Sequence, residues 1–597
     1  MYIVDPSRWD TSRDTGQARF VVDAWLEQVS DDVSHLFSLP LYSTLQLFRN
    51  LQRTLADVDR GVVESRHVRD MTEEILDRLE QECWLDTTHP HDLGLLREHL
   101  RQVQAGHDQV SIRARFASLL RAFLGKVQGN DPIRCEFEHV QSIAANTAAN
   151  FSRLERALNE LINDLLHAGH SRGFLHRWLL AIVVGAPSSR PYLERLAPSG
   201  GLDGSSSRDY EVFFRCQAPP HVPATEEIRF IDSLPCEVVA GLTAQSPFLD
   251  ASVGRFAVVR VAGVCDWLAA VELARDRVRR YFDSTRLEHF RFGRVVEAHA
   301  VVRELPSNRI KYADGLRELT SRPLHNDETF YALQNNGVNK AAFAELDRVL
   351  YWLERSRQAQ DEGRLIALWT ALEFLFGIPA KPIASALAEA LPAYFAPNYA
   401  RTLLIDFWRH ICHARIPLGA ALERELSVAV TATGRRDRTC HLGSLLRVCI
   451  EDEAVNRIKP LIQGYPILVR KWYRVRRLNP AVVPAATNKR AIYTDIEALE
   501  RQLAFDIRTC YRARNMIVHD AANNLGQIDR LSQWLSWLLS TAVDTLLYQY
   551  CRNPSLSLID LHQANLASYE RWKTDLADPQ RPVVASDVLS PRTYFLA

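Results

Sequence analysis

Three side chains suited to phosphodiester chemistry stand close together near residue 515. Arg514, Asn515 and His519 lie within the short segment RNMIVHD. On a helix, residues four apart share one side, so Tyr511, Asn515 and His519 line up, and Arg514 stands about 100° around from Asn515. Histidine can move a proton on or off a 2′-hydroxyl or a leaving oxygen, arginine can hold charge that develops on phosphorus, and asparagine can orient a donor or a water. The set fits cleavage of RNA without a metal.

The spacing by itself is not specific. RVVEAH at 294–299 and RDRTCH at 436–441 have the same separation of arginine and histidine. The segment at 514–519 differs in its setting, because it belongs to a long predicted helix, has an asparagine directly after the arginine, and is filled by Met516, Ile517 and Val518. That setting, rather than the spacing, favours a functional reading.

Arg514 occupies a position where the helix pattern predicts an apolar residue. The apolar stripe runs through Leu499, Leu503, Ile507, Cys510 and Ile517. A guanidinium on such a stripe keeps its charge, so it needs a carboxylate partner or a solvent-filled cleft. Glu373, one turn from Trp369 and Phe376 on another predicted helix, is the expected partner. A buried ion pair of purely structural role is the alternative.

With these residues in view, the chain resembles a known family. RNMIVH, preceded by CYRA and followed by an acidic residue, resembles the motif of HEPN domains, an arginine and a histidine separated by four to six residues, in the form with asparagine after the arginine. LWTALEFLF at 368–376 is similar to the second helix of the ApeA-like branch. The resemblance covers about 330–552. Arg514, Asn515 and His519 match the motif, and Glu373 matches the acidic position of the second helix.

The resemblance implies a four-helix up-and-down domain that dimerises and joins two motifs in one cleft. It also implies a metal-independent endoribonuclease of a toxin, anti-phage or CRISPR-linked system, which leaves cyclic phosphate ends. From it we expect RNA as substrate, a homodimer or higher homo-oligomer, a phage-derived or nucleic-acid trigger, and no cofactor. Residues 1–325 match nothing in the family, and a sensor or regulatory role for them follows only from their position.

A basic stretch at 468–480 is the second candidate for RNA contact. LVRKWYRVRRLNP interleaves aromatic and cationic residues. Cations follow phosphates and aromatic rings stack on bases, so the stretch predicts an RNA path, while a solvated helix face has the same composition. The RNA-binding candidates are Arg470, Lys471, Trp472, Tyr473, Arg474, Arg476 and Arg477.

Composition limits the class of protein. A chain of 597 residues predicts three or four domains, and 47% hydrophobic with 24% charged residues is typical of ordered globular proteins. The formal net charge is zero, so a basic field over the whole molecule is excluded and any nucleic-acid contact must be local. The ten cysteines form no C-x-x-C pair, and the adjacent pairs Cys412-His413 and Cys440-His441 lack metal-ligand spacing, so no metal is expected.

The ends and apolar runs predict a cytoplasmic protein without a membrane segment. MYIVDPSRWDTSRD lacks the basic start and apolar core of a signal peptide. The longest apolar run, WLLAIVVGA at 178–186, is too short to span a bilayer.

Periodicity predicts a mainly α protein with a small α+β part in the middle. Residues 1–186 read as a helical N-terminal domain, 187–209 as a linker rich in Pro, Gly and Ser, and 210–325 as a small α+β domain. In that domain DYEVFFRC, EEIRFID and RFAVVRVAG are predicted strands, Asp266 is the predicted cap of a helix, and RVVEAHAVVREL is a strand or a short helix.

Residues 326–555 predict a HEPN-like four-helix bundle with a long helical insertion. Its helices are expected at 340–358, 361–377, 493–522 and 528–551, with the insertion at about 380–490. The first two are joined by a short turn and are expected to be antiparallel neighbours. Residues 556–597 read as a loosely ordered C-terminal tail.

Three functions remain open at this point. The leading hypothesis is a HEPN endoribonuclease acting in anti-phage defence or abortive infection. The second is a non-catalytic HEPN module that binds RNA, a nucleotide or a partner protein. The third places a nucleotide-processing site in the α+β domain on Asp209 and Glu211, although these carboxylates follow the serines too closely for the usual nucleotidyltransferase pattern.

Overall fold

The computed structural model describes most of the chain. It describes residues 3–4, 9, 15–30, 40–61, 63–80, 83–105, 110–146, 151–184, 196, 207–216, 225, 227–242, 253–288, 296–313, 340–359, 361–377, 383–428, 440–484, 489–520, 528–552 and 555–589. Within these ranges, some residues of the helices and strands have only their backbone described, and His519 is one of them. Most of the predicted linker at 187–209 lies outside the described residues.

The first part of the chain is helical, as its periodicity predicted. Ser43 and Gln46 form a reciprocal capping box that starts the second helix, and a stripe that includes Leu154, Leu158 and Leu165 buries one face of the eighth. The helices are α1 (Gly16–Gln28), α2 (Thr44–Asp59), α3 (Arg66–Leu79), α4 (Trp84–Thr88), α5 (Pro90–Gln104), α6 (Val110–Gln128), α7 (Pro132–Ala145), α8 (Phe151–His167) and α9 (Arg172–Val184).

The middle of the chain forms an antiparallel sheet of five strands in the order β2-β3-β1-β4-β5. The strands are β1 (Arg208–Cys216), β2 (Ile228–Ser233), β3 (Val253–Val264), β4 (Val296–Leu305) and β5 (Ile310–Ala313). The three predicted strands are confirmed, and the segment left open between strand and helix is β4.

Helices cover both faces of the sheet. Alternation along β1 sends Val212 toward α12 (Trp267–Glu288) and Phe213 toward α11 (Cys236–Gly241). Asp266 caps α12 as predicted, because its Oδ1 accepts a hydrogen bond from the backbone N–H of Ala269 at 2.7 Å. Its Oδ2 also accepts from the backbone N–H of Ser171, so one carboxylate fixes the starts of α9 and α12.

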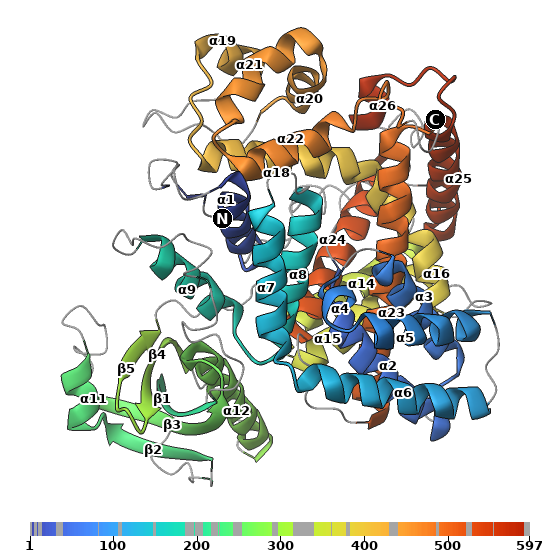
Figure 1. Ribbon diagram of the computed structural model, residues 1–597. Coiled ribbons are helices and arrows are strands. Elements are labelled where there is room, and N and C mark those ends of the chain that lie inside the picture. The colour runs from blue at the N-terminus through green and yellow to red at the C-terminus, as the bar shows by residue number, and fades with distance from the viewer. Residues whose placement is uncertain are drawn as a thin grey trace. The chain divides into compact units, whose positions relative to one another are not determined.

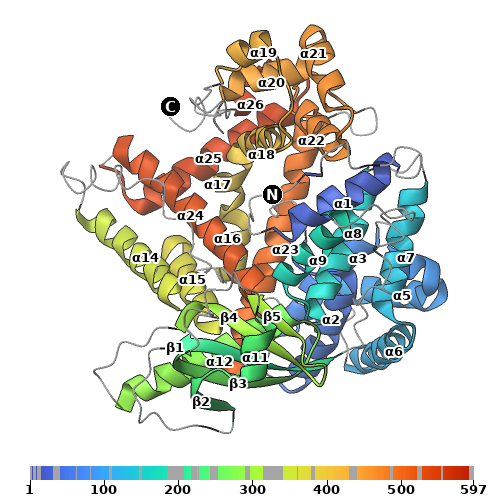
Figure 2. The same cartoon turned by 90° about the vertical axis from the view of Figure 1, so that its left-hand side faces the viewer.

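The helices expected after residue 326 are confirmed. They are α14 (Lys340–Gln358), α15 (Asp361–Phe376), α23 (Ala491–Asp520) and α24 (Ile528–Arg552). Helix α15 packs against α14, α23 and α24, and α14 and α15 are neighbours joined by a short connection, as predicted (Figure 2). The insertion is also helical, with α16 (Ile383–Ala390), α17 (Pro392–Phe395), α18 (Tyr399–His413), α19 (Ala420–Glu425), α20 (Leu442–Ile450), α21 (Asp452–Ile462) and α22 (Pro466–Arg476).

The expectation of a loosely ordered tail is wrong. Residues 558–577 form α25 (Leu558–Ala577), and α26 (Ala585–Leu589) follows it. Ser557 and Asp560 make a capping box at the start of α25, and Tyr569 and Trp572 are buried in the apolar core. Residues 558–589 are therefore part of the packed structure.

The chain divides into two compact units, and the division differs from the expected order of domains. A helical unit comprises residues 1–163, 191–193 and 321–597, and a sheet unit comprises residues 164–190 and 194–320. One apolar core cluster contains residues from both ends of the chain, from Leu45 on α2 to Leu576 on α25. Helix α3 lies beside α23, although more than four hundred residues separate them (Figure 1).

No helix in the described ranges has the length and apolar character that a bilayer crossing requires.

Candidate functional site

The segment RNMIVHD forms the last two turns of α23, a helix of 30 residues. Ile507, Cys510 and Ala513 are fully buried, whereas Arg514 is half-buried. The core-facing stripe thus steps by three residues to Ala513 where a step of four was expected. The inference that Arg514 sits in a core position is wrong, because the small Ala513 fills that position and leaves the arginine at the edge of the core.

Arg514 and Asn515 are in contact with each other. Arg514 Nη1 donates a hydrogen bond to Asn515 Oδ1 at 3.0 Å. Among the described residues, Arg514 forms no ion pair with Glu373, whose Oε1 instead accepts a 2.7 Å hydrogen bond from Trp369 Nε1. His519 lies on the same helix, and its side chain is outside the described residues. Two of the three motif side chains are therefore seen together.

Tyr511 joins the motif helix to two others. Its ring centroid lies 5.6 Å from that of His67 on α3 and 5.5 Å from that of Trp369 on α15. The indole of Trp369 is also fixed by its hydrogen bond to Glu373. The two supporting residues predicted from sequence, Tyr511 and Glu373, thus belong to one row of side chains that fixes α23 against α3 and α15.

A cleft opens beside Asn515, between the motif helix and the N-terminal helices. We call it the motif cleft. It encloses about 500 Å³ of space that is partly open to solvent. It is lined by Tyr42, Asn50, Arg53, Thr54, Asp57, Val63, His67, Thr509, Arg512, Ala513, Asn515 and Met516. Sequence reasoning gave Asn515 from this set and missed the rest, because no local pattern links residues 42–67 to residues 509–516.

The cationic groups of the motif cleft are only partly paired. Arg512 Nη2 lies 3.3 Å from a carboxylate oxygen of Glu74 and donates to Thr509 Oγ1 at 2.9 Å, while its Nη1 is buried and has no hydrogen-bond partner in the described structure. Arg53 is exposed, and no described residue forms an ion pair with it. Burial, and after it the charge of Arg512, lower the pKa of His67. The cleft therefore offers guanidinium donors and a neutral imidazole.

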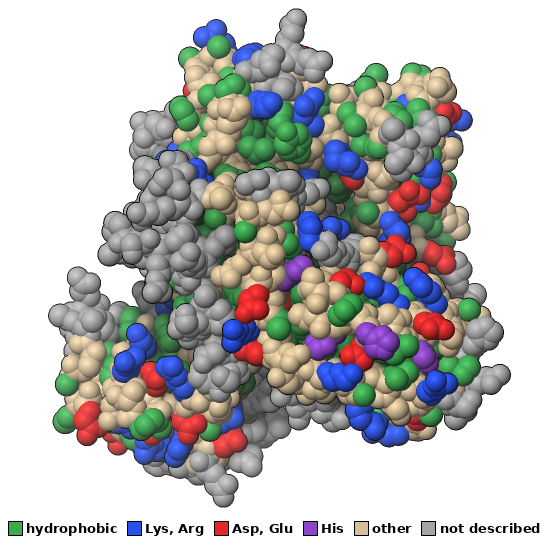
Figure 3. Space-filling model, viewed as in Figure 1, with side chains coloured by type: hydrophobic (Ala, Val, Ile, Leu, Met, Phe, Trp, Pro, Cys, Tyr) green, Lys and Arg blue, Asp and Glu red, His purple; other side chains and the backbone are tan. Residues whose placement is uncertain are grey.

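The surface around these helices carries charges of both signs. On the face shown in Figure 3, acidic and basic side chains are interspersed over α3, α5 and α6. This agrees with the formal net charge of zero.

Asp506, two turns before the motif, is a buried carboxylate that forms no ion pair with any of the described residues. Gln502 Nε2 donates to its Oδ1 at 2.8 Å, and its Oδ2 has no partner among the described residues. Burial, reinforced by the charge of Glu74, raises the pKa of Asp506 well above its ordinary value. Asp506 therefore holds its proton up to a higher pH in the folded protein than in the unfolded chain.

Replacing Asp506 by asparagine is expected to stabilise the protein at pH 8 by about 1–3 kcal/mol, since the amide is neutral at every pH. In the wild type, the contribution of Asp506 to the free energy of unfolding falls as pH rises above 3.8, the ordinary pKa of aspartate. Above that pH the unfolded chain loses the Asp506 proton more readily than the folded protein does. Urea unfolding at pH 5 and pH 8 measures the effect, and the advantage of the variant should be larger at pH 8. An advantage of equal size at both pH values would contradict this account.

Most of the basic stretch at 470–477 is used within the protein. Arg470 pairs with Glu155 at 3.1 Å, and Arg477 pairs with Asp495 at 2.7 Å. Lys471 is buried, with its Nζ 2.6 Å from a carboxylate oxygen of Glu27. Carboxylates from other parts of the chain neutralise these cations. The stretch therefore does not offer a continuous path of free cations to RNA.

The remaining residues of the stretch differ in exposure. Trp472 is buried, and the guanidinium of Arg476 lies 5.1 Å from its ring centroid. The side chain of Arg474 is hydrogen-bonded to Tyr399, a contact that helps to raise the pKa of Arg474 although burial opposes it. Only Tyr473, 49% exposed, and the half-buried Arg476 combine accessibility with freedom from a carboxylate in the described structure. RNA contact stays a prediction for these two residues.

A metal site can be tested at one buried cluster. Glu27, Asp406 and His410 present ligand atoms within 4.8 Å of one another, and no other group of three in the described ranges does so. Lys471 Nζ lies 2.6 Å from Glu27 and 2.5 Å from Asp406, so an ammonium already stands where a cation would bind. The cluster fits a structural ion-pair network better than a metal centre. Of the adjacent Cys-His pairs, His441 accepts from the backbone N–H of Ser444 and caps α20.

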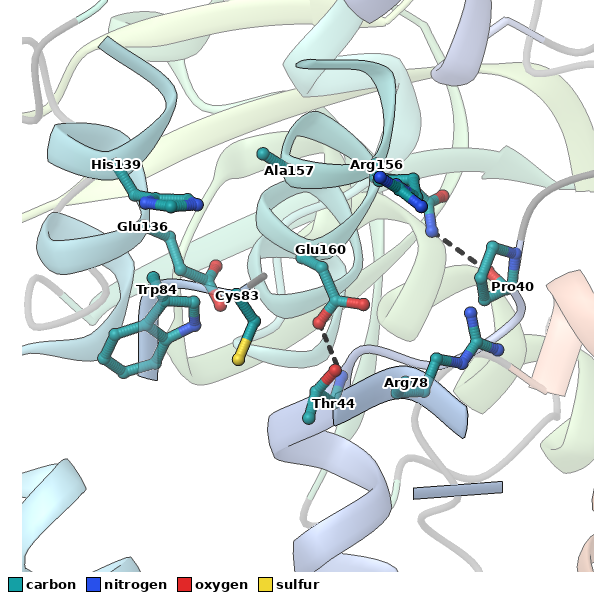
Figure 4. A pocket seen from close by; sticks show the side chains of 11 residues that line it. Pro40, Thr44, Arg78, Cys83, Trp84, Glu136, His139, Arg156, Ala157 and Glu160 are labelled. Atoms are coloured by element: carbon teal, nitrogen blue, oxygen red, sulfur yellow. Dashed lines mark hydrogen bonds between the residues drawn. The ribbon is translucent and has the colours of Figure 1, made fainter. Parts of the chain in front are cut away.

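A second cleft lies among α3, α4, α7 and α8 (Figure 4). Its polar groups include Glu136, Glu160 and Cys83. Glu160 accepts a 2.6 Å hydrogen bond from the backbone N–H of Thr44 at the start of α2. Burial raises the pKa of Cys83 to about 12, so its thiol stays protonated and is a poor nucleophile. This cleft carries no motif residue.

Asp209 and Glu211 of the sheet unit form ion pairs with arginines of other strands. Glu211 pairs with Arg229 at 2.7 Å and also with Arg303, and Asp209 pairs with Arg260 at 3.3 Å. Arginines already neutralise both carboxylates, so they are poorly suited to hold a metal. The alternative of a nucleotide-processing site on Asp209 and Glu211 is thereby weakened.

Comparison with protein-family models, curated proteins and solved structures finds no match to this chain. The HEPN resemblance therefore rests on the residues of the motif and on their surroundings alone.

Proposed function

We propose that this protein is a metal-independent endoribonuclease of the HEPN type. The observation that carries the proposal is the pairing of Arg514 with Asn515 at the end of a long helix, directly beside a cleft lined by Arg53, His67 and Arg512. A guanidinium and an amide held together at the edge of a cationic cleft suit a phosphodiester substrate. His519 completes the set on the same helix.

The proposed reaction is an internal transfer at phosphorus. The 2′-oxygen of a ribose forms a bond to the adjacent phosphorus while the bond from phosphorus to the 5′-oxygen breaks. The proton of the 2′-hydroxyl leaves and a proton is delivered to the 5′-oxygen, and His519 of either motif copy performs these transfers. Arg514 stabilises the charge on the phosphoryl oxygens, and Asn515 orients Arg514. The products are a cyclic phosphate end and a 5′-hydroxyl end.

In this proposal two copies of the chain bring two motifs together, as the family resemblance implies. The enzyme acts in defence against phage, by abortive infection, and a phage-derived molecule or a nucleic acid releases its activity. The sheet unit, which carries no motif residue, is the proposed receiver of that signal. The partners are thus RNA, a second copy of the chain and a trigger.

A non-catalytic module is the second candidate. Arg514 is half-buried and bonded to its neighbour, and Tyr511 and Glu373 serve packing through Trp369. A HEPN-like domain that binds RNA, a nucleotide or a partner protein without cutting would have the same features. The two candidates differ in whether RNA is broken.

Removal of the motif histidine or arginine is expected to lower RNA cleavage at least about 100-fold, because general acid–base groups contribute on that scale. Purified wild type, His519→Ala and Arg514→Ala are incubated with total RNA, with and without lysate of phage-infected cells. Arg501→Ala, an exposed position on the same helix, should cut like wild type. The enzyme proposal would be wrong, and the binding module favoured, if the wild type left RNA intact with and without lysate. The same conclusion would follow if both motif variants cut RNA at the wild-type rate.

A further inference from the structure

The motif cleft joins elements from both ends of the chain at the motif. Its lining comes from α2, α3 and α23 and from Tyr42 and Val63 in the segments that flank α2, all within the helical unit. Resting on the proposed function, we infer that this cleft holds the nucleotide next to the phosphate that is cut, with Arg53 and Arg512 binding a backbone phosphate. The N-terminal helices then supply part of the substrate site in the same chain as the motif.

The cationic groups carry the first step of this inference. Arg512 Nη1 is buried and has no hydrogen-bond partner in the described structure, while Glu74 and Thr509 hold Nη2 in place. A fixed guanidinium with a spare donor is suited to a phosphate oxygen, because arginine binds phosphate through parallel N–H groups and cannot lose its charge. Arg53, exposed and without an ion pair among the described residues, adds a second cation.

The acidic residue of the lining does not cancel this charge. Asp57 is buried and forms an ion pair with Arg60, the residue that follows α2 as its C-cap. Glu74 neutralises part of the charge of Arg512, although burial raises the pKa of Glu74 and weakens its ionised form. The local balance therefore favours an anion over a cation as the occupant.

The rest of the lining suits a nucleoside. Val63, Ala513 and Met516 contribute apolar groups to the lining, and Asn50 and Thr54 from α2 contribute polar ones. The Thr54 hydroxyl donates to the backbone carbonyl of Asn50 at 2.9 Å and keeps its acceptor capacity. An aromatic base could contact the apolar lining residues while its phosphate binds the arginines, so one nucleotide would contact both the apolar and the cationic groups of the cleft.

Asn515 connects the cleft to the reaction. It lines the cleft and also accepts the hydrogen bond from Arg514. A strand whose nucleotide lies in the cleft would therefore continue, within one phosphate, to the arginine of the motif. A free mononucleotide has the same phosphate chemistry, and the experiment must separate it from an RNA strand.

Arg53→Glu is expected to weaken binding of RNA at least 10-fold. The probe is a fluorescein-labelled single-stranded RNA of twelve mixed nucleotides, titrated with His519→Ala protein so that the probe is not cut, and read by fluorescence anisotropy. The slope of log affinity against log salt should fall by about 0.7 for a lost phosphate contact to a single strand. Arg69→Glu, an exposed position on α3 outside the cleft, is the matched control and should bind like the parent.

A second variant tests the cleft without changing charge. Asn50→Phe fills the space from the half-buried α2 position, and it should also weaken RNA binding if its thermal unfolding midpoint matches that of the parent. Equal RNA binding by Arg53→Glu, Asn50→Phe and Arg69→Glu would overturn the inference. Binding of adenosine monophosphate but not of the RNA would also overturn it, in favour of a site for a free nucleotide.

The outcomes separate this inference from the proposed function. If wild type leaves RNA intact while Arg53→Glu still weakens binding, the nuclease proposal fails and the RNA site in the cleft stands. If wild type cuts RNA and Arg53→Glu cuts with unchanged KM and kcat, the cleft inference fails alone. A rise in KM with little change in kcat is the expected result for a residue that holds substrate away from the reacting bond.

Discussion

Replacing Lys471 by methionine should lower the free energy of unfolding by about 3–5 kcal/mol, the usual range when one partner of a buried charge network is removed. Lys471 Nζ lies between carboxylate oxygens of Glu27 on α1 and Asp406 on α18, at 2.6 Å and 2.5 Å. Without the ammonium, two buried carboxylates would face each other and the imidazole of His410. Urea unfolding followed by tryptophan fluorescence measures the change.

Two controls define the cause of that loss. Lys459→Met makes the same substitution at an exposed position of α21 and should change stability by less than about 0.5 kcal/mol. Combining Lys471→Met with Glu27→Gln and Asp406→Asn removes the uncompensated charges and should recover much of the loss. A single variant as stable as wild type, or a triple variant no better than the single one, would show that the network is not what stabilises this region.

The network also sets a pH window. Burial raises the pKa of Asp406, but Lys471 and His410 outweigh it and hold that pKa well below the ordinary 3.8. Burial lowers the pKa of Lys471, but Asp406 and Glu27 outweigh it and hold that pKa above the ordinary 10.5. The stabilisation is therefore complete between about pH 4 and pH 10 and is lost as pH falls through the folded pKa of Asp406 or rises through that of Lys471.

Replacing Arg490 by alanine is expected to cost about 3 kcal/mol and to release the end of α25. Arg490 is buried and donates hydrogen bonds to backbone carbonyl groups of Pro480, Asp575, Leu576, Asp578, Pro579 and Arg581. Several of these lie at the C-terminal end of α25, where carbonyls lack helix partners and the dipole favours a cation. Each carbonyl left buried without a donor costs about 1–3 kcal/mol, with incomplete additivity.

Amide hydrogen exchange at residues 572–581, together with urea unfolding, measures this effect. Arg490→Lys keeps the charge but offers three donors, so it should recover only part of the stability. Arg571→Ala, at an exposed position on α25, is the matched control and should leave exchange unchanged. Exchange in Arg490→Ala that equals wild type would contradict the role of Arg490 as the anchor of α25.

Local patterns predicted the elements well. The helices at 340–358 and 361–376 follow from an apolar period that needs no distant partner, and the strands around Val212 and Val259 follow from short β-branched runs with turn residues between them. The tail was misjudged although a signal was present. Ser557 and Asp560 have capping-box spacing, and Leu561, Asn565, Tyr569, Trp572 and Leu576 follow at helical intervals.

The site was harder to predict because its neighbours are distant in sequence. The partners of Lys471 are 65 and 444 residues away, and His67 reaches Tyr511 from the other end of the chain. A local sequence pattern indicates that a cationic residue is present, but it does not indicate which residues contact that cation in the folded protein. The apolar stripe of α23 continues from Cys510 to Ala513, and the sequence did not predict this for a different reason. Alanine is common on both the buried and the exposed side of a helix, so its presence does not indicate which side is buried.

The discontinuous helical unit has a consequence for synthesis on the ribosome. Helix α3 emerges early, but α23, which it packs against, follows about four hundred residues later. At about 5–20 residues per second, the delay is on the order of a minute. During that time the apolar faces of α2 and α3 are not yet buried against α23. The sheet unit, which lies between them and α23 in the sequence, can already complete its own core. The nascent chain should therefore depend on chaperone protection, and α23 cannot dock until nearly the whole protein has been made.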